Sequence, residues 1–292
     1  MLFKGAGVAI ITPFTKNHEV DFEALGQLID FQIENGVDGI ISIGTTGEAA
    51  VLSEDEKIEV VKYTLERVNK RVPVMAGTGS NDTKQAVRFS KLISELGVDG
   101  LLVVSPYYNK GTEQGLIEQY TQIANESSKP VMLYTVPGRT GHNIPIDVVV
   151  ELSKHPNIFG IKDASGDLTY TMAIRRQTAD DFQIMSGNDD LILPMLSVGA
   201  EGVISVIANV FPHETSEMVH QFLDGNIRQA QELQLKFLPF VETMFSEVSP
   251  VPVKYATHLL GFGTAEVRLP LTIAQPSTQA LVAKALKDLG RL

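Results

Sequence analysis

The stretch GLLVVSPYYNKGTEQGLIEQYTQIANESSKPVML, residues 100–133, contains the alternation that decides the fold. Residues 100–104 are a continuous apolar run, which is typical of a strand buried on both faces of a parallel sheet. Residues 113–125 have helical periodicity, and residues 131–133 are a second apolar run. A helix between two buried strands predicts that the strands pair in parallel.

The same unit recurs along the chain. Apolar runs predict eight strands, over residues 8–11, 39–43, 72–76, 100–104, 131–133, 158–161, 182–185 and 202–205. Helical segments follow them over residues 22–34, 53–68, 83–96, 113–125, 147–153, 169–178, 190–198 and 212–223, and Ser53 with Glu56 forms a capping-box pattern. Eight such units predict a closed (β/α)8 TIM barrel. An open doubly wound sheet is disfavoured because no Gly-x-Gly-x-x-Gly turn follows the first strand.

The chain after residue 224 follows a different pattern. Residues 226–246, 251–260 and 277–289 are predicted helices with no strands between them, and prolines mark the breaks. We therefore expect a catalytic barrel over residues 1–224 and a C-terminal helical domain over residues 225–292.

Composition excludes several classes of function. The formal net charge of -11 disfavours binding to nucleic acid or to a membrane surface, which needs clustered positive charge. The absence of cysteine excludes disulfides, thiolate catalysis and cysteine-ligated metals, and the six histidines have no metal-ligand spacing. No apolar stretch approaches the roughly 20 residues that span a bilayer. The short apolar run near the start is interpreted as a strand and not as a signal peptide, so we expect a cytoplasmic protein.

Lys162 is the most informative residue, because it directly follows the sixth predicted strand. Catalytic groups of parallel barrels lie at the carboxyl ends of the strands. Partial burial there disfavours the ammonium form and favours an amine nucleophile, as Schiff-base chemistry on a ketone requires. The alternatives are a lysine whose head extends to solvent and an ion pair with Asp163.

Other strand ends carry polar groups that suit the same chemistry. Tyr134 could transfer protons, or it could simply pack on the barrel rim. Thr45 and Thr46 offer hydroxyls and backbone N–H groups to a carboxylate, although ordinary turn formation also explains them. Arg139 suits a second carboxylate or lies in solvent. The adjacent pair Tyr107 and Tyr108 fits either a catalytic rim or a subunit contact.

Taken together, these motifs resemble the dihydrodipicolinate synthase family of pyruvate-dependent class I aldolases over essentially the whole chain. The motifs that carry the resemblance are residues 9–14 (AIITPF), 44–48 (GTTGE), 76–79 (AGTG), 106–109 (PYYN), 134–140 (YTVPGRT), 160–163 (GIKD), 252–254 (PVK) and 268–271 (RLPL). The resemblance implies a lyase that condenses pyruvate with L-aspartate 4-semialdehyde to form 4-hydroxy-tetrahydrodipicolinate, in diaminopimelate and lysine biosynthesis.

The resemblance also implies roles for individual residues. Lys162 matches the lysine that forms the imine and then the enamine. Thr45, Tyr134 and Tyr108 match a proton-relay triad, in which the neighbouring subunit supplies Tyr108. The substrate-binding positions are Thr46 and nearby amides for the pyruvate carboxylate, Arg139 for the semialdehyde carboxylate, and Gly187 and the Ile204 carbonyl lining the pocket.

The family needs no metal or organic cofactor and is usually a homotetramer of tight dimers. Feedback-sensitive members tend to carry histidine at the position of Lys57 and glutamate at that of Gln85. The cationic and neutral residues found here predict weak or absent inhibition by lysine, which is itself cationic. Thr135 replaces a common asparagine, and we expect little effect on the chemistry.

Three other functions remain as alternatives. A sister aldolase acting on N-acetylneuraminate or a 2-keto-3-deoxy sugar acid shares the lysine, the tyrosine and the fold, but commonly lacks the arginine at 139. A non-catalytic barrel is disfavoured because Lys162, Tyr134 and Thr45 are all present. A metal-dependent aldolase is disfavoured by the absence of ligand spacing.

Overall fold

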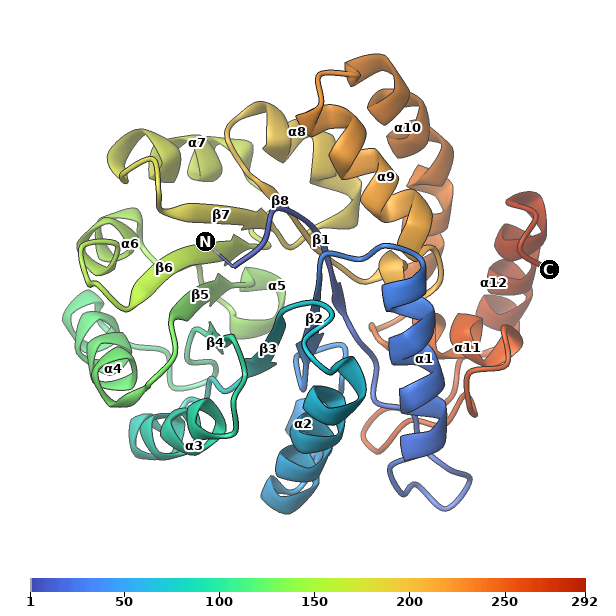
Figure 1. Cartoon of the computed structure of the whole chain (residues 1–292), viewed down its shortest axis with the longest axis horizontal. Helices are drawn as coiled ribbons and strands as arrows, with labels where there is room; N and C mark the ends of the chain where they lie inside the picture. The colour runs from blue at the N-terminus through green and yellow to red at the C-terminus, as the bar shows by residue number, and fades with distance from the viewer. Residues whose placement is uncertain (1) are drawn as a thin grey trace.

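The computed structural model describes residues 2–292, in which eight parallel strands close into a barrel surrounded by helices (Figure 1). The strands are β1 (Gly5–Ala9), β2 (Gly39–Ser42), β3 (Val74–Gly77), β4 (Gly100–Val104), β5 (Val131–Thr135), β6 (Ile158–Asp163), β7 (Gln183–Ser186) and β8 (Gly202–Ser205). β1 pairs in parallel with both β2 and β8, so the sheet has no free edge. The predicted TIM barrel is confirmed.

The helices follow the strands in the predicted order. They are α1 (Phe22–Glu34), α2 (Glu54–Val68), α3 (Thr83–Glu95), α4 (Glu113–Glu126), α6 (Ile146–Leu152), α7 (Leu168–Gln177), α8 (Ile192–Ser197) and α9 (Pro212–Leu223). Shorter helical turns are η1 (Ala49–Val51), α5 (Pro137–Thr140), η2 (Asp189–Leu191) and η3 (Ile207–Asn209). The capping box is confirmed, because Ser53 and Glu56 each bond the other's backbone N–H at the start of α2.

Two apolar cores hold the barrel together. Alternate strand residues face opposite sides of the sheet, so one set packs under the helices and the other fills the barrel interior. The interior set comprises Phe3, Ala9, Ile41, Met75, Leu102, Met132, Tyr134, Met185 and Ile204. The barrel is therefore a packed core, and only its rim can carry a site.

The first strand differs from its prediction. It spans Gly5–Ala9, and not residues 8–11, because the sequence criteria penalise glycine in strands. Glycine is needed here for close packing. A Cβ at Gly7 would lie 2.7 Å from the Phe3 ring, and one at Gly202 in the paired strand β8 would lie 2.0 Å from the Gly5 carbonyl oxygen. Closure of the sheet thus depends on small residues.

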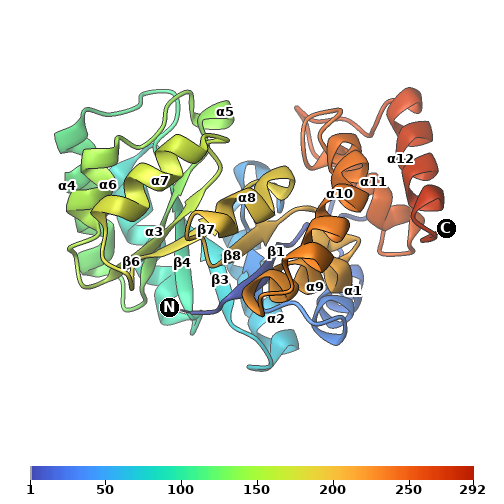
Figure 2. The same ribbon diagram turned by 90° about the horizontal axis from the view of Figure 1, so that it is seen from above.

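Three further helices follow the barrel: α10 (Ile227–Met244), α11 (Val251–Leu259) and α12 (Pro276–Asp288). α10 packs on α9, and α12 packs on both α10 and α11. Figure 2 shows α11 and α12 at the end of the molecule away from α4 and α6. Among residues 2–292, no helix is both long enough and apolar enough to cross a membrane.

Candidate active site

Lys162 lies within β6, so the sixth strand extends beyond its predicted end at residue 161. Its side chain is only 6% exposed, and its Nζ lies 4.5 Å from the centroid of the Tyr134 ring. The two residues are direct partners in the pairing of β5 with β6, which places them on the same face of the sheet. The lysine head is therefore held against an aromatic ring in the barrel mouth and does not extend freely into water.

Asp163 is not the partner of Lys162. Neighbouring residues of a strand point to opposite faces, and the Asp163 carboxylate accepts hydrogen bonds from the Thr171 hydroxyl at 2.6 Å and the Ser165 N–H at 2.8 Å. Both of its oxygens are engaged behind the sheet. This leaves the amine of Lys162 facing the barrel interior.

Gly187 leaves room for the lysine stem. A Cβ at this position would lie 3.0 Å from Cε of Lys162 and 2.7 Å from Cβ of Ala164. A side chain at residue 187 would push the lysine aside or be pushed itself. The structure therefore places Gly187 beside Lys162, and the buried Ile204 lies in the same interior core as Tyr134.

A cavity of about 780 Å³ opens at the carboxyl ends of the strands. Its lining includes Thr45 from the turn after β2, Tyr134 from β5 and Arg139 from α5. Tyr134 thus contacts both the cavity and the amine of Lys162. The structure brings these four residues to one end of the barrel.

Thr45 and Thr46 lie in a tight turn. The Glu48 N–H donates to the Thr45 carbonyl at 3.1 Å and closes the turn, and the Thr12 hydroxyl donates to the Gly47 carbonyl at 2.7 Å. Thr46 is buried and Thr45 is half-buried. Hydroxyls held on such a turn present a fixed geometry to a ligand.

Arg139 lies at the cavity wall. Its segment is the short helix α5, which begins at Pro137 and which the predicted helices did not include. Proline is favourable at the first position of a helix. A segment of four residues is too short to show the helical periodicity from which the other helices were predicted. The guanidinium donates from Nη2 to the Ser249 carbonyl at 2.8 Å and remains at the cavity wall. A carboxylate entering the cavity can reach its remaining donors.

Tyr108 does not join this group within the chain. Its side chain is 93% exposed and its φ angle is +65°, a conformation that is unfavourable for a bulky residue. Its neighbour Tyr107 lines the cavity and is half as exposed. Tyr108 is therefore not part of the lining of the cavity in its own chain.

Two buried groups were missed at the sequence level. Asp189, in η2, is fully buried and accepts the N–H groups of Val206 and Ile207. Burial raises the pKa of its carboxyl, and these hydrogen bonds oppose that shift.

Lys254 forms a buried ion pair with Glu48. Burial lowers the pKa of the Lys254 ammonium to about 8, and Glu48 opposes that shift. Glu48 and Lys254 belong to the motifs at residues 44–48 and 252–254, but no sequence pattern predicted that they form an ion pair.

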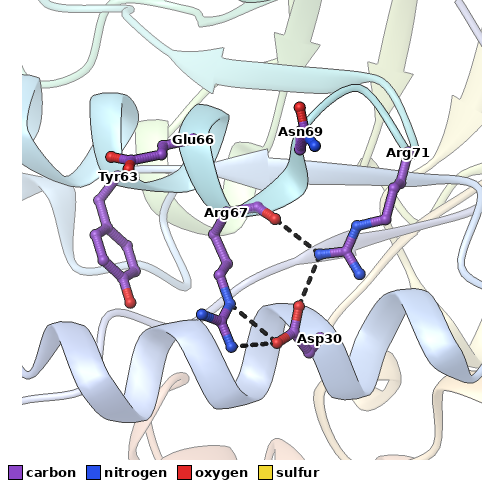
Figure 3. A pocket seen from close by; sticks show the side chains of 6 residues that line it. All are labelled: Asp30, Tyr63, Glu66, Arg67, Asn69 and Arg71. Carbon is purple, nitrogen blue, oxygen red and sulfur yellow. Dashed lines mark hydrogen bonds and ion pairs between the residues drawn. The ribbon is translucent and has the colours of Figure 1, made fainter.

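A second pocket, of about 410 Å³, is lined by side chains of α1, α2 and the segment after α2 (Figure 3). Asp30 of α1 accepts from Arg67 Nε at 2.9 Å and from Arg71 Nη2 at 2.7 Å. Burial favours a higher pKa for Asp30, but the hydrogen bonds with both arginines outweigh it and hold the pKa below its ordinary value. Arg67 and Arg71 precede β3, so the pocket lies at the amino ends of the strands, opposite the rim where barrel chemistry occurs.

Comparison with known sequences gives one consistent family. Residues 2–289 match the dihydrodipicolinate synthetase family. The 4-hydroxy-tetrahydrodipicolinate synthase of Caldicellulosiruptor saccharolyticus is 50% identical over 289 residues, which cover 99% of this chain and 98% of that protein.

Solved structures agree in fold. Dihydrodipicolinate synthase from Thermotoga maritima superposes with a TM-score of 0.98 at 39% identity, and the match covers 100% of both chains. The lysine-bound enzyme of Cyanidioschyzon merolae superposes with a TM-score of 0.97 at 38% identity, over 100% of this chain and 99% of that one. A full-length family match and a relative at this identity show that the chain belongs to the dihydrodipicolinate synthetase family.

Proposed function

We propose that the chain is a 4-hydroxy-tetrahydrodipicolinate synthase, which condenses pyruvate with L-aspartate 4-semialdehyde. The observation that carries the proposal is the position of Lys162, whose amine is buried at 4.5 Å from the Tyr134 ring at the mouth of the barrel. The relatives that bear this name match the whole chain. A buried amine packed against a tyrosine ring suits attack on a ketone.

The first covalent step forms an imine. The neutral amine of Lys162 attacks the ketone carbon of pyruvate, and the carbonyl oxygen takes up a proton to give a carbinolamine. Loss of that oxygen as water leaves the iminium, and loss of a methyl proton gives the enamine. Tyr134 and Thr45 supply hydroxyls for these proton transfers, with Tyr108 completing the relay. The lysine itself acts as the electron sink, so the chemistry needs no metal or organic cofactor.

The second step joins the substrates. The enamine carbon attacks the aldehyde of the semialdehyde, and the aldehyde oxygen takes up a proton as the new carbon–carbon bond forms. The amino group of the bound product then attacks the imine carbon, which closes the ring and releases the lysine amine. Balanced over both steps, pyruvate and the semialdehyde give the cyclic product and one water.

Two groups hold the carboxylates of the substrates. Thr46 and the N–H groups of its turn suit the pyruvate carboxylate, and we assign Gly187 and the Ile204 carbonyl to the same subsite. Arg139 suits the carboxylate of the semialdehyde, because its guanidinium lies at the cavity wall with donors to spare. This arginine favours the synthase over an aldolase for sugar acids, whose substrates carry hydroxyls at that end.

We also propose that the protein assembles as a homotetramer built from tight dimers. The exposed side chain of Tyr108 supports the dimer contact, in which its hydroxyl would reach the relay of a neighbouring copy. The strained backbone of Tyr108 is consistent with a residue held for function.

Replacing Lys162 with alanine should abolish imine formation, because within residues 2–292 no other lysine packs against the Tyr134 ring. Sodium borohydride reduces the imine to a stable adduct, which intact-protein and peptide mass spectrometry locate. Wild-type protein should carry one pyruvyl group at Lys162, and Lys57→Ala, which removes a lysine at the cavity wall, should keep it. An adduct retained by Lys162→Ala would contradict the assignment.

Replacing Arg139 with alanine should raise KM for the semialdehyde by about 10- to 100-fold, the range expected for lost charge-assisted hydrogen bonds. The rate of imine formation with pyruvate should stay within about twofold, since the arginine acts on the second substrate. Steady-state kinetics and single-turnover trapping separate the two effects. Equal losses in both measurements would count against the role of Arg139.

Inhibition by lysine is proposed to be weak or absent. Lys57 and Gln85 both line the cavity. The Lys57 Nζ lies 5.7 Å from the Phe89 ring, where burial lowers its pKa, and the Gln85 side chain accepts a hydrogen bond from Ser80. A bound lysine would meet a cation at one position and no carboxylate at the other.

Condensation assayed with added L-lysine should therefore show little inhibition in the millimolar range. The double variant Lys57→His, Gln85→Glu should become more sensitive, because it removes the repulsion and adds an acceptor. A submillimolar inhibition constant for the wild-type protein would overturn this proposal.

A further inference from the structure

A buried ion pair links the C-terminal helices to the turn that carries Thr45 and Thr46. The Nζ atom of Lys254 in α11 lies 2.6 Å from Oε1 of Glu48, just after β2, and the two side chains are 0% and 2% exposed. Two charges fully removed from water are costly unless each keeps its partner. The pair thus joins residues that are 206 positions apart in sequence.

The surroundings of the pair complete its hydrogen bonding. The second carboxylate oxygen of Glu48 accepts the Arg268 N–H at 3.1 Å. The Lys254 Nζ also lies 3.9 Å from the centroid of the Phe14 ring, and the Arg268 guanidinium lies over the same ring at 4.5 Å. The Arg268 side chain in turn binds Glu56 in the first turn of α2. The network therefore connects α11, the exit of β1 and the start of α2.

Glu48 also determines the shape of the threonine turn. Its φ angle of +55° is unfavourable for a residue with a Cβ, so an external interaction must hold it. Its N–H closes the turn onto Thr45, while its side chain is anchored by Lys254. Glu48 lines the cavity, but both of its carboxylate oxygens are engaged, which leaves it a supporting group and not an acid or base.

We propose that Glu48 and Lys254 are positioning residues for the condensation. Their ion pair fixes the turn that presents Thr45 and Thr46, and so makes the C-terminal helices part of the catalytic geometry. This inference rests on the proposed function, in which Thr45 belongs to the proton relay. Small displacements of a relay hydroxyl slow catalysis strongly, although the displaced group stays in the site.

The test compares Lys254→Met, Thr45→Val and the double variant of the full-length protein. Lys254→Met should lower kcat for the condensation about 10- to 100-fold while the protein remains folded. In the Thr45→Val background the same change should lower kcat by less than about twofold, because the hydroxyl that it positions is already gone. Losses that multiply in the double variant, or an unchanged kcat in Lys254→Met, would overturn the proposal.

A matched control separates positioning from general stability. Asp30→Asn breaks an ion-pair network between α1 and the end of α2 (Figure 3). The network lies before β3, at the opposite end of the barrel. It should lower the denaturant midpoint while kcat stays within about twofold. A similar fall of kcat in both variants would assign the effect to stability and contradict the proposal.

A second variant covers the case in which Lys254→Met fails to fold because it leaves Glu48 charged and unpaired. Glu48→Gln with Lys254→Met buries no net charge and keeps an acceptor for the Arg268 N–H. The kcat of this double variant is then compared with and without Thr45→Val. The supporting and contradicting results are the same as for Lys254→Met. Imine formation and turnover of the wild-type protein are measured first. A protein that forms no imine contradicts the proposed function, whereas normal wild-type turnover that Lys254→Met leaves unchanged contradicts this inference alone.

Discussion

Closure of the sheet is the constraint on which the rest of the structure depends. When β8 pairs with β1, all eight strands run in parallel and all their carboxyl ends meet at one rim. Residues 45, 134, 162 and 187, which are far apart in sequence, are thereby brought to the same end of the barrel. The closure itself depends on glycine, since a Cβ at Gly202 would collide with the backbone of Gly5.

The amine of Lys162, the proposed nucleophile, is enclosed at the barrel mouth. Lys162 lies in a strand whose next residue, Asp163, turns its carboxylate to the other face, where Thr171 and Ser165 bind it. An aromatic ring covers the amine and a glycine leaves room for its stem. A separate buried ion pair, between Glu48 and Lys254, lies beside the threonine turn. A buried amine and a firmly held turn of hydroxyls suit nucleophilic catalysis with fixed proton donors.

Local patterns predicted most of the fold, because buried parallel strands are apolar runs and amphipathic helices repeat every 3.6 residues. They failed where packing overrides propensity, as in β1, where Gly7 makes room for Phe3. They also failed to predict α5, because its four residues are too few to show a helical repeat. The site residues were visible at strand ends, but the ion pair of Glu48 with Lys254 was not, since nothing in a single sequence links positions 206 residues apart. The role of Tyr108 depends on a second copy of the chain and stays a prediction.

The most direct test of the account is turnover of the purified protein with pyruvate and L-aspartate 4-semialdehyde, followed through NADPH oxidation by the reductase that consumes the product. The account predicts steady turnover that requires both substrates and survives EDTA. Protein that forms the reducible imine with pyruvate but gives no turnover with the semialdehyde would contradict it. That result would keep the Schiff-base mechanism and assign the second substrate to the sugar acids.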